Sequence, residues 1–113
     1  MDEQTAVAFV ARARTAPAAG YTELRRVLDA ERSDDVRSVL LKGLGELARL
    51  VTTVDESASF LERAAAHGRS AGRDDLVGEA MLTMAGTRLL AGDVASAMQA
   101  LEQAGRAPVD LRH

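Results

Sequence analysis

The stretch from Leu76 to Ala104 constrains the fold of this chain more than any other part of its sequence. It reads LVGEAMLTMAGTRLLAGDVASAMQALEQA, and apolar residues recur every three or four positions on both sides of Gly92-Asp93. This spacing places them on one face of an α-helix. Glycine ends a helix in the left-handed conformation that only it adopts cheaply, and aspartate caps the helix that follows. The stretch therefore predicts two helices joined by a tight turn.

A second stretch of the same design lies about forty residues upstream, and the composition agrees with a helical chain. Hydrophobic residues make up 47% of the 113 residues, yet aromatic residues only 3%, and Trp is absent. Alanine and leucine supply most of the apolar surface, which favours closely packed helices over a β-sandwich. The length suits one domain with a modest core. The sequence predicts a single all-α domain over residues 1–113.

Capping signals and periodicity divide the chain into six helices in three hairpins, at about residues 4–31, 34–71 and 74–106. Asp34-Asp35 and Asp74-Asp75 mark two helix starts, and Thr53 with Glu56 matches a capping box. Pro17 and Gly20 are expected to end the first helix. Gly45 lies inside a predicted helix, where glycine costs stability, so we expect another backbone close to it.

The last helix is expected to begin at the cap Asp93 and to stop at Pro108, before a short tail at 109–113. Its predicted inward face is made by five residues at helical spacing: Val94, Ala97, Met98, Leu101 and Ala104.

Aligning the second and third hairpins at a shift of forty residues superposes structural positions in both helices. The third hairpin then resembles tetratricopeptide repeats, on the residues Met81, Met84-Ala85, Gly92, Ala97, Leu101, Ala104 and Pro108. The resemblance covers about residues 34–108. It implies a short right-handed α-solenoid of about three helix hairpins. It also implies a non-enzymatic scaffold or adaptor that binds another protein.

The longer period and the Ala-Gly-Asp turn are also similar to repeats of large bacterial proteins, where they precede CHAT-type peptidase domains or the effector domains of multidomain regulators. This similarity implies an alternative function, as the N-terminal repeat segment of such a protein. A third interpretation is a small-ligand sensing domain, with a pocket among Met81, Met84, Phe9 and Tyr21.

In the tetratricopeptide fold, the first helix of each hairpin lines a concave surface, and the resemblance therefore implies a partner-binding surface on this chain. It comprises Val39, Lys42, Glu46, Arg49, Glu79, Leu82, Gly86 and Leu89. Lys42 and Arg49 could hold an acidic peptide, whereas Leu82 and Leu89 would accept an apolar helix or extended segment. The leucines could instead pack on a further repeat. Self-association into a homodimer is a further expectation, since an uncapped end leaves apolar surface.

No catalytic constellation, metal or cofactor is expected. The chain has no cysteine and two histidines. His67 with Ser70 and Asp74 has the residue types of a triad, but all three lie on one turn, and a solvated helix end explains them better. The paired aspartates are interpreted as helix caps.

The charge balance is not typical of proteins that bind nucleic acid or membranes, so neither partner is expected. The formal net charge is −3, the basic residues are scattered among acidic ones, and no apolar run is long enough for a membrane span. Without cysteines or a targeting segment, the expected location is the cytoplasm.

Overall fold

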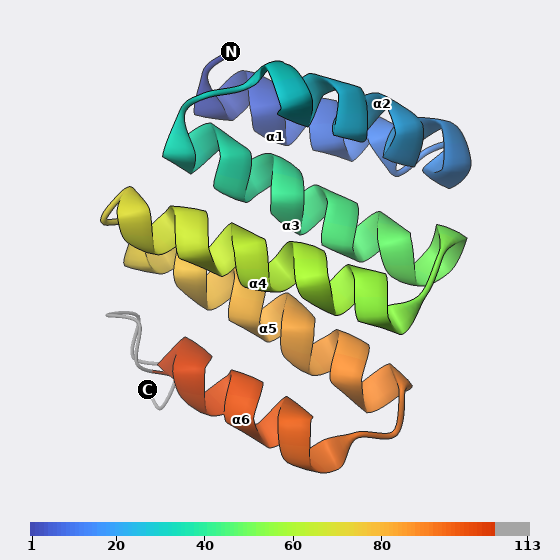
Figure 1. The fold of residues 1–113 in the computed structure, drawn as a ribbon, viewed down its shortest axis with the longest axis vertical. Coiled ribbons are helices and arrows are strands. Elements are labelled where there is room, and N and C mark those ends of the chain that lie inside the picture. The colour runs from blue at the N-terminus through green and yellow to red at the C-terminus, as the bar shows by residue number, and fades with distance from the viewer. Residues whose placement is uncertain (106–113) are drawn as a thin grey trace.

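The computed structural model describes residues 1–105, which form six α-helices and no strand (Figure 1). The helices are α1 Glu3–Ala13, α2 Pro17–Ala30, α3 Asp34–Val51, α4 Val54–Ser70, α5 Asp74–Leu90 and α6 Val94–Gly105. The predicted all-α class is confirmed. Pro108 and the tail at 109–113 lie outside the described residues.

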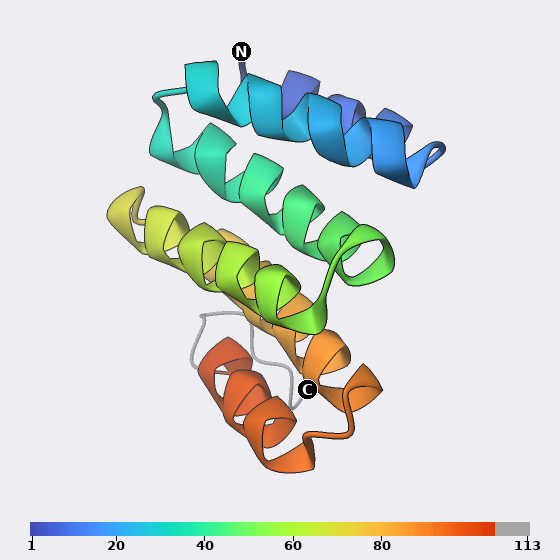
Figure 2. The same ribbon diagram turned by 45° about the vertical axis from the view of Figure 1, so that its right-hand side comes forward.

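The six helices are stacked in chain order along the long axis, with α1 and α2 at one end and α6 at the other (Figures 1 and 2). Each helix packs against the next one in sequence. In addition, α3 contacts both α1 and α5, so these three first helices of the hairpins share one side of the molecule. Helix α3 is therefore central, and most of the core surrounds it.

The second and third hairpins start at equivalent positions, forty residues apart. Helices α3 and α5 begin at Asp34 and Asp74, and α4 and α6 at Val54 and Val94. The paired aspartates mark the starts of α3 and α5 as predicted, but they are first-turn residues and not caps, and neither helix has a side-chain capping bond. The caps of α4 and α6 do correspond. Thr53 Oγ1 accepts from the Glu56 amide at 3.1 Å, as the capping box predicts, and Asp93 Oδ1 accepts from the Ser96 amide at 3.0 Å. Gly92 has φ +77°, which confirms its predicted left-handed turn.

Close approach of α3 and α4 at Gly45 is also confirmed. A Cβ at Gly45 would lie 2.5 Å from Leu61 Cγ, and the Ser57 hydroxyl donates to the Gly45 carbonyl at 2.6 Å. Small residues at this crossing bring the two helices together, and Leu61 fills the remaining space with its side chain fully buried.

Helix α1 ends at Ala13, before Pro17, as predicted, but the prediction for Gly20 is wrong. Pro17 is the first residue of α2, where the missing N–H is harmless and the fixed φ suits a helix. Gly20 lies inside α2, where a Cβ would overlap the carbonyl of Ala13. Pro17 thus marks the start of α2, and Gly20 allows α1 to pack closely on α2.

The predicted inward face of α6 is partly wrong. Ala97 and Ala104 are buried as expected, together with Ala100, but Val94, Met98 and Leu101 are 60%, 61% and 41% exposed. Helix α6 approaches α5 through its alanines because small side chains allow the closest packing. The three large side chains are thereby turned to the side, where no further helix covers them among the described residues.

Candidate binding cleft

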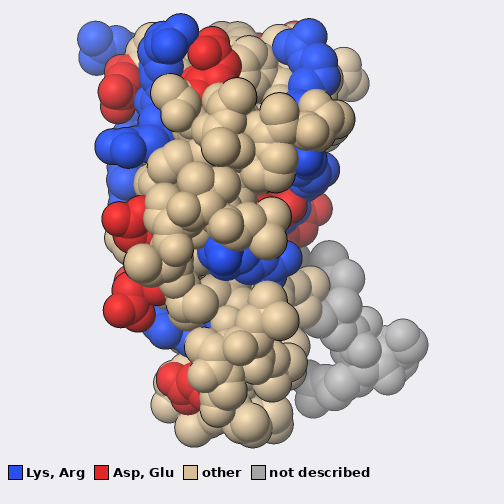
Figure 3. Space-filling model, turned by 90° about the vertical axis from the view of Figure 1, so that its right-hand side faces the viewer, with Lys and Arg blue, Asp and Glu red and all other residues tan. Residues whose placement is uncertain are grey.

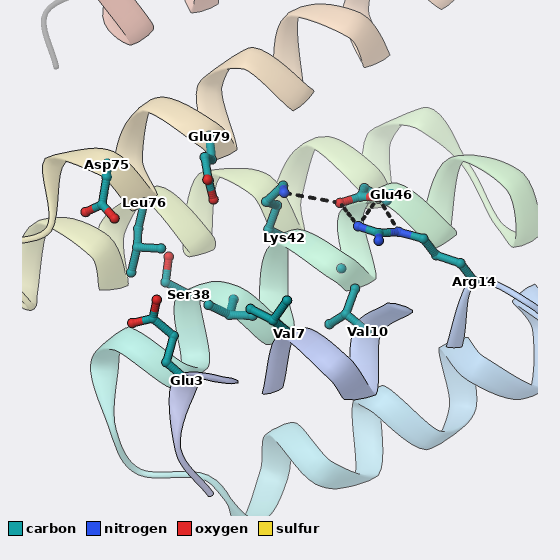
Figure 4. Close-up of a pocket in the computed structure, with 12 residues that line it drawn as sticks. Glu3, Val7, Val10, Arg14, Ser38, Lys42, Glu46, Asp75, Leu76 and Glu79 are labelled. Atoms are coloured by element: carbon teal, nitrogen blue, oxygen red, sulfur yellow. Dashed lines mark hydrogen bonds and ion pairs between the residues drawn. The ribbon is translucent and has the colours of Figure 1, made fainter. Parts of the chain in front are cut away.

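A cleft opens on the side shared by α1, α3 and α5 (Figure 4). Its volume is about 210 Å³. The lining residues are Glu3, Val7, Val10 and Arg14 from α1, Ser38, Val39, Lys42, Gly43 and Glu46 from α3, and Asp75, Leu76 and Glu79 from α5. Helix α3 supplies the middle of the cleft and the other two helices supply its sides.

The approach of α1 to α3 depends on Gly43. A Cβ at this position would lie 2.7 Å from Val10 Cγ2, so the valine packs directly on the α3 backbone. Val10 is buried, while Val7 and Arg14, about one turn to either side of it, reach the exposed rim of the cleft. One glycine contact thus sets where α1 contributes its side chains.

The apolar part of the cleft comes from all three helices. Leu76 is buried, Val39 is half-buried and packs against the main core, and Val7 is 54% exposed. Together they form a small apolar floor between two groups of charged side chains, as the close-up shows for the labelled Val7 and Leu76 (Figure 4). The floor can bury one apolar side chain of a ligand.

At one end of the cleft, Glu46 is shared by two cationic side chains. Arg14 Nε and Nη2 donate to the Glu46 carboxylate at 3.0 and 3.1 Å, and Lys42 Nζ lies 3.5 Å from the same group. Two positive charges against one negative charge leave this end with a net positive charge. The planar fork of Arg14 fixes the carboxylate through two bonds.

At the opposite end, Arg73 is shared by two carboxylates. Its guanidinium donates to Glu3 Oε1 and Oε2 at 2.6 and 3.1 Å, and to Asp75 Oδ1 and Oδ2 at 2.9 and 2.8 Å. These bonds raise the pKa of Arg73, Asp75 contributing more than Glu3, and they lower the pKa of the Asp75 carboxyl. This end carries a net negative charge.

The Glu79 carboxylate has no ion pair or hydrogen bond with any residue in the described range. It stands on α5 one turn after Asp75, and its side chain points into the cleft (Figure 4). Because Lys42 is engaged with Glu46, the charge of Glu79 is not neutralised by a side chain of the cleft. It is the charged group most available to a ligand.

Four residues of the predicted partner-binding surface line this cleft: Val39, Lys42, Glu46 and Glu79. The other four continue along α3 and α5 towards α6. Arg49 Nη1 lies 3.6 Å from where a Gly86 Cβ would be and 3.4 Å from the Thr87 hydroxyl. Leu82 and Leu89 are 42% and 54% exposed. Sequence reasoning missed the α1 side of the cleft and Arg73, because their partners are distant in the sequence.

His67 is bonded to Asp34 and Arg37, and not to Ser70 and Asp74, with which it has the residue types of a triad. Its Nδ1 lies 2.7 Å from Asp34 Oδ1, and its Nε2 accepts from Arg37 at 3.4 Å. The histidine therefore joins the end of α4 to the start of α3, and the Ser70-His67-Asp74 arrangement does not form. Within residues 1–105, no three His, Asp or Glu side chains are grouped so that they could hold a metal ion.

The predicted small-ligand pocket among Met81, Met84, Phe9 and Tyr21 does not form either. The two methionines border a depression between α4, α5 and α6, whereas Phe9 borders another between α1 and α2. Tyr21 packs edge-on against Phe60, with ring centroids 6.1 Å apart, and its hydroxyl donates to Glu56. The four side chains belong to three separate places.

The protein is thus all-α, with an open cleft on the side of α1, α3 and α5. No helix in the described part of the chain is both long and apolar enough to cross a membrane. Comparison with protein families, curated proteins and solved structures found no match to this chain.

Proposed function

We propose that this protein is a non-enzymatic interaction module, a short helical-repeat scaffold that holds a segment of another protein in the cleft of α1, α3 and α5. The observation that carries the proposal is the cleft itself, an apolar floor between oppositely charged ends with one unneutralised carboxylate, Glu79. Such a mixture of one apolar pocket and a few placed charges is typical of sites that recognise a peptide side chain by side chain.

The size of the cleft supports a peptide over a metabolite. Pockets for small molecules commonly hold about 300–1,000 Å³ and enclose most of their ligand. The cleft here has about 210 Å³ and opens between three helices. It has room for one or two side chains, with the rest of the ligand lying along the surface.

The charges of the cleft indicate which side chains the bound segment would carry and in which direction it would run. A lysine or arginine would lie beside Glu79 and the Glu3–Arg73–Asp75 group, where negative charge is in excess. An apolar residue would follow on the floor, and an acidic residue would suit the Arg14–Glu46–Lys42 end. This replaces the simpler idea of an acidic peptide on Lys42 and Arg49, because Lys42 already has a carboxylate partner.

The surface beyond the cleft can lengthen the contact. Leu82, Gly86 and Leu89 follow Glu79 along α5 at helical spacing, so they lie on the same side of that helix. Both leucines are exposed, and the small Gly86 leaves space between them. An extended segment or helix bound in the cleft would continue over these residues and bury them.

A library of octapeptides with one fixed position at a time tests the proposal on the purified protein. We expect enrichment of peptides in which a basic residue precedes or follows an apolar one. Glu79→Gln should weaken binding of the selected peptide about fivefold, the size of one exposed ion pair. The control Glu62→Gln, an exposed carboxylate on α4, should leave binding unchanged. Enrichment of peptides without a preference for basic residues would contradict the proposal. An equal loss of peptide binding in Glu79→Gln and Glu62→Gln would contradict it as well.

A further inference from the structure

Two charged side chains of the cleft have hydrogen-bonding atoms that no other described residue uses. The Glu79 carboxylate accepts no hydrogen bond within residues 1–105. The Lys42 ammonium lies 3.5 Å from the Glu46 carboxylate in a loose ion pair, but it donates no hydrogen bond to any residue of that range. Glu46 does not depend on Lys42, because Arg14 already donates to it through two nitrogen atoms. The cleft therefore offers an unused acceptor on α5 and an unused donor on α3.

The two groups stand beside the apolar floor in matching positions. On α3, Lys42 follows Val39 by three residues, and on α5, Glu79 follows Leu76 by three residues. Residues at this spacing are neighbours on the same side of a helix. In Figure 4 both charged side chains reach into the cleft from their two helices. A ligand residue whose apolar side chain rests on the floor thus brings its own main chain next to Lys42 and Glu79.

A peptide group has the atoms that fit this pair. Each residue of a main chain carries one N–H donor and one C=O acceptor, and the two groups of a planar trans peptide point in opposite directions. A single peptide group between α3 and α5 can therefore direct its carbonyl to Lys42 and its N–H to Glu79. Burying it beside the apolar floor without these partners would be costly. Because a carboxylate has two oxygens, Glu79 can still accept from a basic side chain.

An extended chain fits the cleft better than an α-helix. The main-chain groups within a helix already pair with one another, so they are not available to Lys42 and Glu79. One helical turn, about 10 Å wide and about 5.4 Å long, also occupies roughly 400 Å³. The cleft has about 210 Å³, so a helix would rest on its rim. The main chain of an extended segment is thinner, and it can enter beside the floor.

The neighbouring face of the molecule has a different surface. Figure 3 shows uncharged residues over most of it, while acidic and basic side chains stand mainly along its edges. A segment lying there could bury apolar side chains, but few charged groups would be close to its main chain. The combination of an apolar floor with an unused donor and an unused acceptor therefore favours the cleft.

We infer that the cleft holds its segment in an extended conformation and by its main chain, an inference that rests on the proposed function and specifies how the same site binds. One residue of the segment, the anchor residue, places its apolar side chain on the floor. A peptide group beside it accepts from Lys42 Nζ through its carbonyl and donates to the Glu79 carboxylate through its N–H. Lys42 and Glu79 thereby recognise a main-chain conformation in addition to the charges of the side chains.

N-methylation of the octapeptide that the library selects tests this inference. The peptide is acetylated and amidated, so that its terminal charges are removed, and each N–H in turn is replaced by N–CH₃. Methylation at one position next to the anchor residue should weaken binding about tenfold or more, the size of a hydrogen bond to a charged group. The N–H that follows points to the other side of an extended chain, so methylation there should be tolerated.

The possible results separate the main-chain contact from the proposed function. If the unmodified octapeptide does not bind, the proposed function is contradicted, and the main-chain contact falls with it. If it binds and every methylated peptide binds equally well, only the main-chain contact is overturned. The same octapeptide, locked into a helix by a lactam bridge between two positions without preference in the library, should bind more weakly than the open peptide. Tighter binding of the helical form would overturn the extended conformation.

Combining the sensitive methyl group with Glu79→Ala identifies the acceptor. This variant has no carboxylate to receive the N–H, so the methylation that weakens binding to the wild type should cost little in the variant. Glu62→Ala, which removes an exposed carboxylate from α4, should keep the full loss. An equal loss in the wild type and in Glu79→Ala would overturn the role of Glu79.

Lys42→Met tests the donor. The probe is the same octapeptide with its acidic residues changed to glutamine or asparagine, so that a loss cannot come from an acidic side chain. Binding should fall about fivefold in Lys42→Met, because the peptide carbonyl loses a charged donor. Arg69→Met removes an exposed positive charge from α4 and should bind as the wild type does. Equal binding by the wild type and Lys42→Met would overturn the role of Lys42.

Discussion

The Ser57 hydroxyl donates a hydrogen bond of 2.6 Å to the carbonyl oxygen of Gly45, at a close approach of α3 and α4. Both groups are buried, and Ser57 Oγ also lies 3.3 Å from the Thr87 hydroxyl of α5. The contact therefore connects three consecutive helices. It holds α3 at the centre of the stack, where α3 forms the middle of the cleft.

Gly45→Ala should destabilise the protein by about 1–3 kcal/mol, the usual cost of adding a methyl group to a well-packed core. The new Cβ would lie 2.5 Å from Leu61 Cγ and 3.3 Å from the Ser57 carbonyl, so the crossing must widen. Urea unfolding measures the change. Gly86→Ala is the matched control, because its Cβ would meet only Arg49 Nη1 at 3.6 Å. That variant should gain up to about 1 kcal/mol from helix propensity. Equal effects at the two positions would contradict the close crossing.

Thr53→Ala should lower the free energy of unfolding by about 1 kcal/mol, since Thr53 Oγ1 caps α4 by accepting from the Glu56 amide. Thermal unfolding followed by circular dichroism measures the loss. Ser59→Ala removes a hydroxyl from the exposed side of the same helix and should change little. If both variants have the same melting temperature as the wild type, Thr53 is not an effective cap.

The capping signals show which parts of this fold are readable from sequence. Thr53, Gly92 and Asp93 act through atoms a few residues away, so the local sequence holds the whole interaction. Gly45 was predictable for a related reason, because a costly residue inside a helix indicates a packing constraint. The all-α class and the starts of α3, α4, α5 and α6 follow from such local signals, whereas the start of α2 at Pro17 does not.

Helix α6 shows where the sequence is ambiguous. Its apolar residues form two adjacent faces, one of valine, methionine and leucine and one of alanines, and hydrophobicity favours the larger side chains. Burial instead follows the alanines, Ala97, Ala100 and Ala104, since only small residues let α6 approach α5 closely. Periodicity does not decide between two such faces, because tertiary packing selects one of them.

The α1 side of the cleft was not predictable for a different reason. Arg14 meets Glu46 across 32 positions of sequence, and Arg73 meets Glu3 across 70. Charged residues on exposed helix faces look alike in sequence whether or not they have such partners. Only the stacking of α1, α3 and α5 brings them together.

Acid should weaken the protein partly through Asp75. The hydrogen bonds from Arg73 lower the pKa of this carboxyl in the folded state. A lowered pKa stabilises the fold above the ordinary aspartate value of about 4, and this contribution is lost as the pH falls through the folded value. In Arg73→Ala, the difference between the urea midpoints at pH 7 and pH 3 should therefore shrink. Arg69→Ala, at an exposed position on α4, should keep the wild-type difference. An unchanged pH dependence in Arg73→Ala would show that the pair does not contribute.

Leu82→Asp with Leu89→Asp should abolish association with a partner while leaving the helical content intact. Both side chains are exposed, so new charges there cost little in the folded state but cannot be buried under a ligand. Pull-down and circular dichroism measure the two effects. Ser59→Asp with Ala66→Asp places the same charges at the same spacing on the exposed side of α4 and serves as the control. Partner binding that survives the leucine changes would remove these residues from the surface.

The most direct test of the proposed function is an amide chemical-shift titration of the labelled protein with the basic and apolar octapeptide that the library selects. The largest shifts should fall on residues lining the cleft, above all Val7, Val39 and Glu79, and extend along α5 to Leu82. The amide signals of residues on the exposed sides of α2 and α4 should not shift. Shifts confined to those sides, or to α6, would contradict the cleft as the binding site.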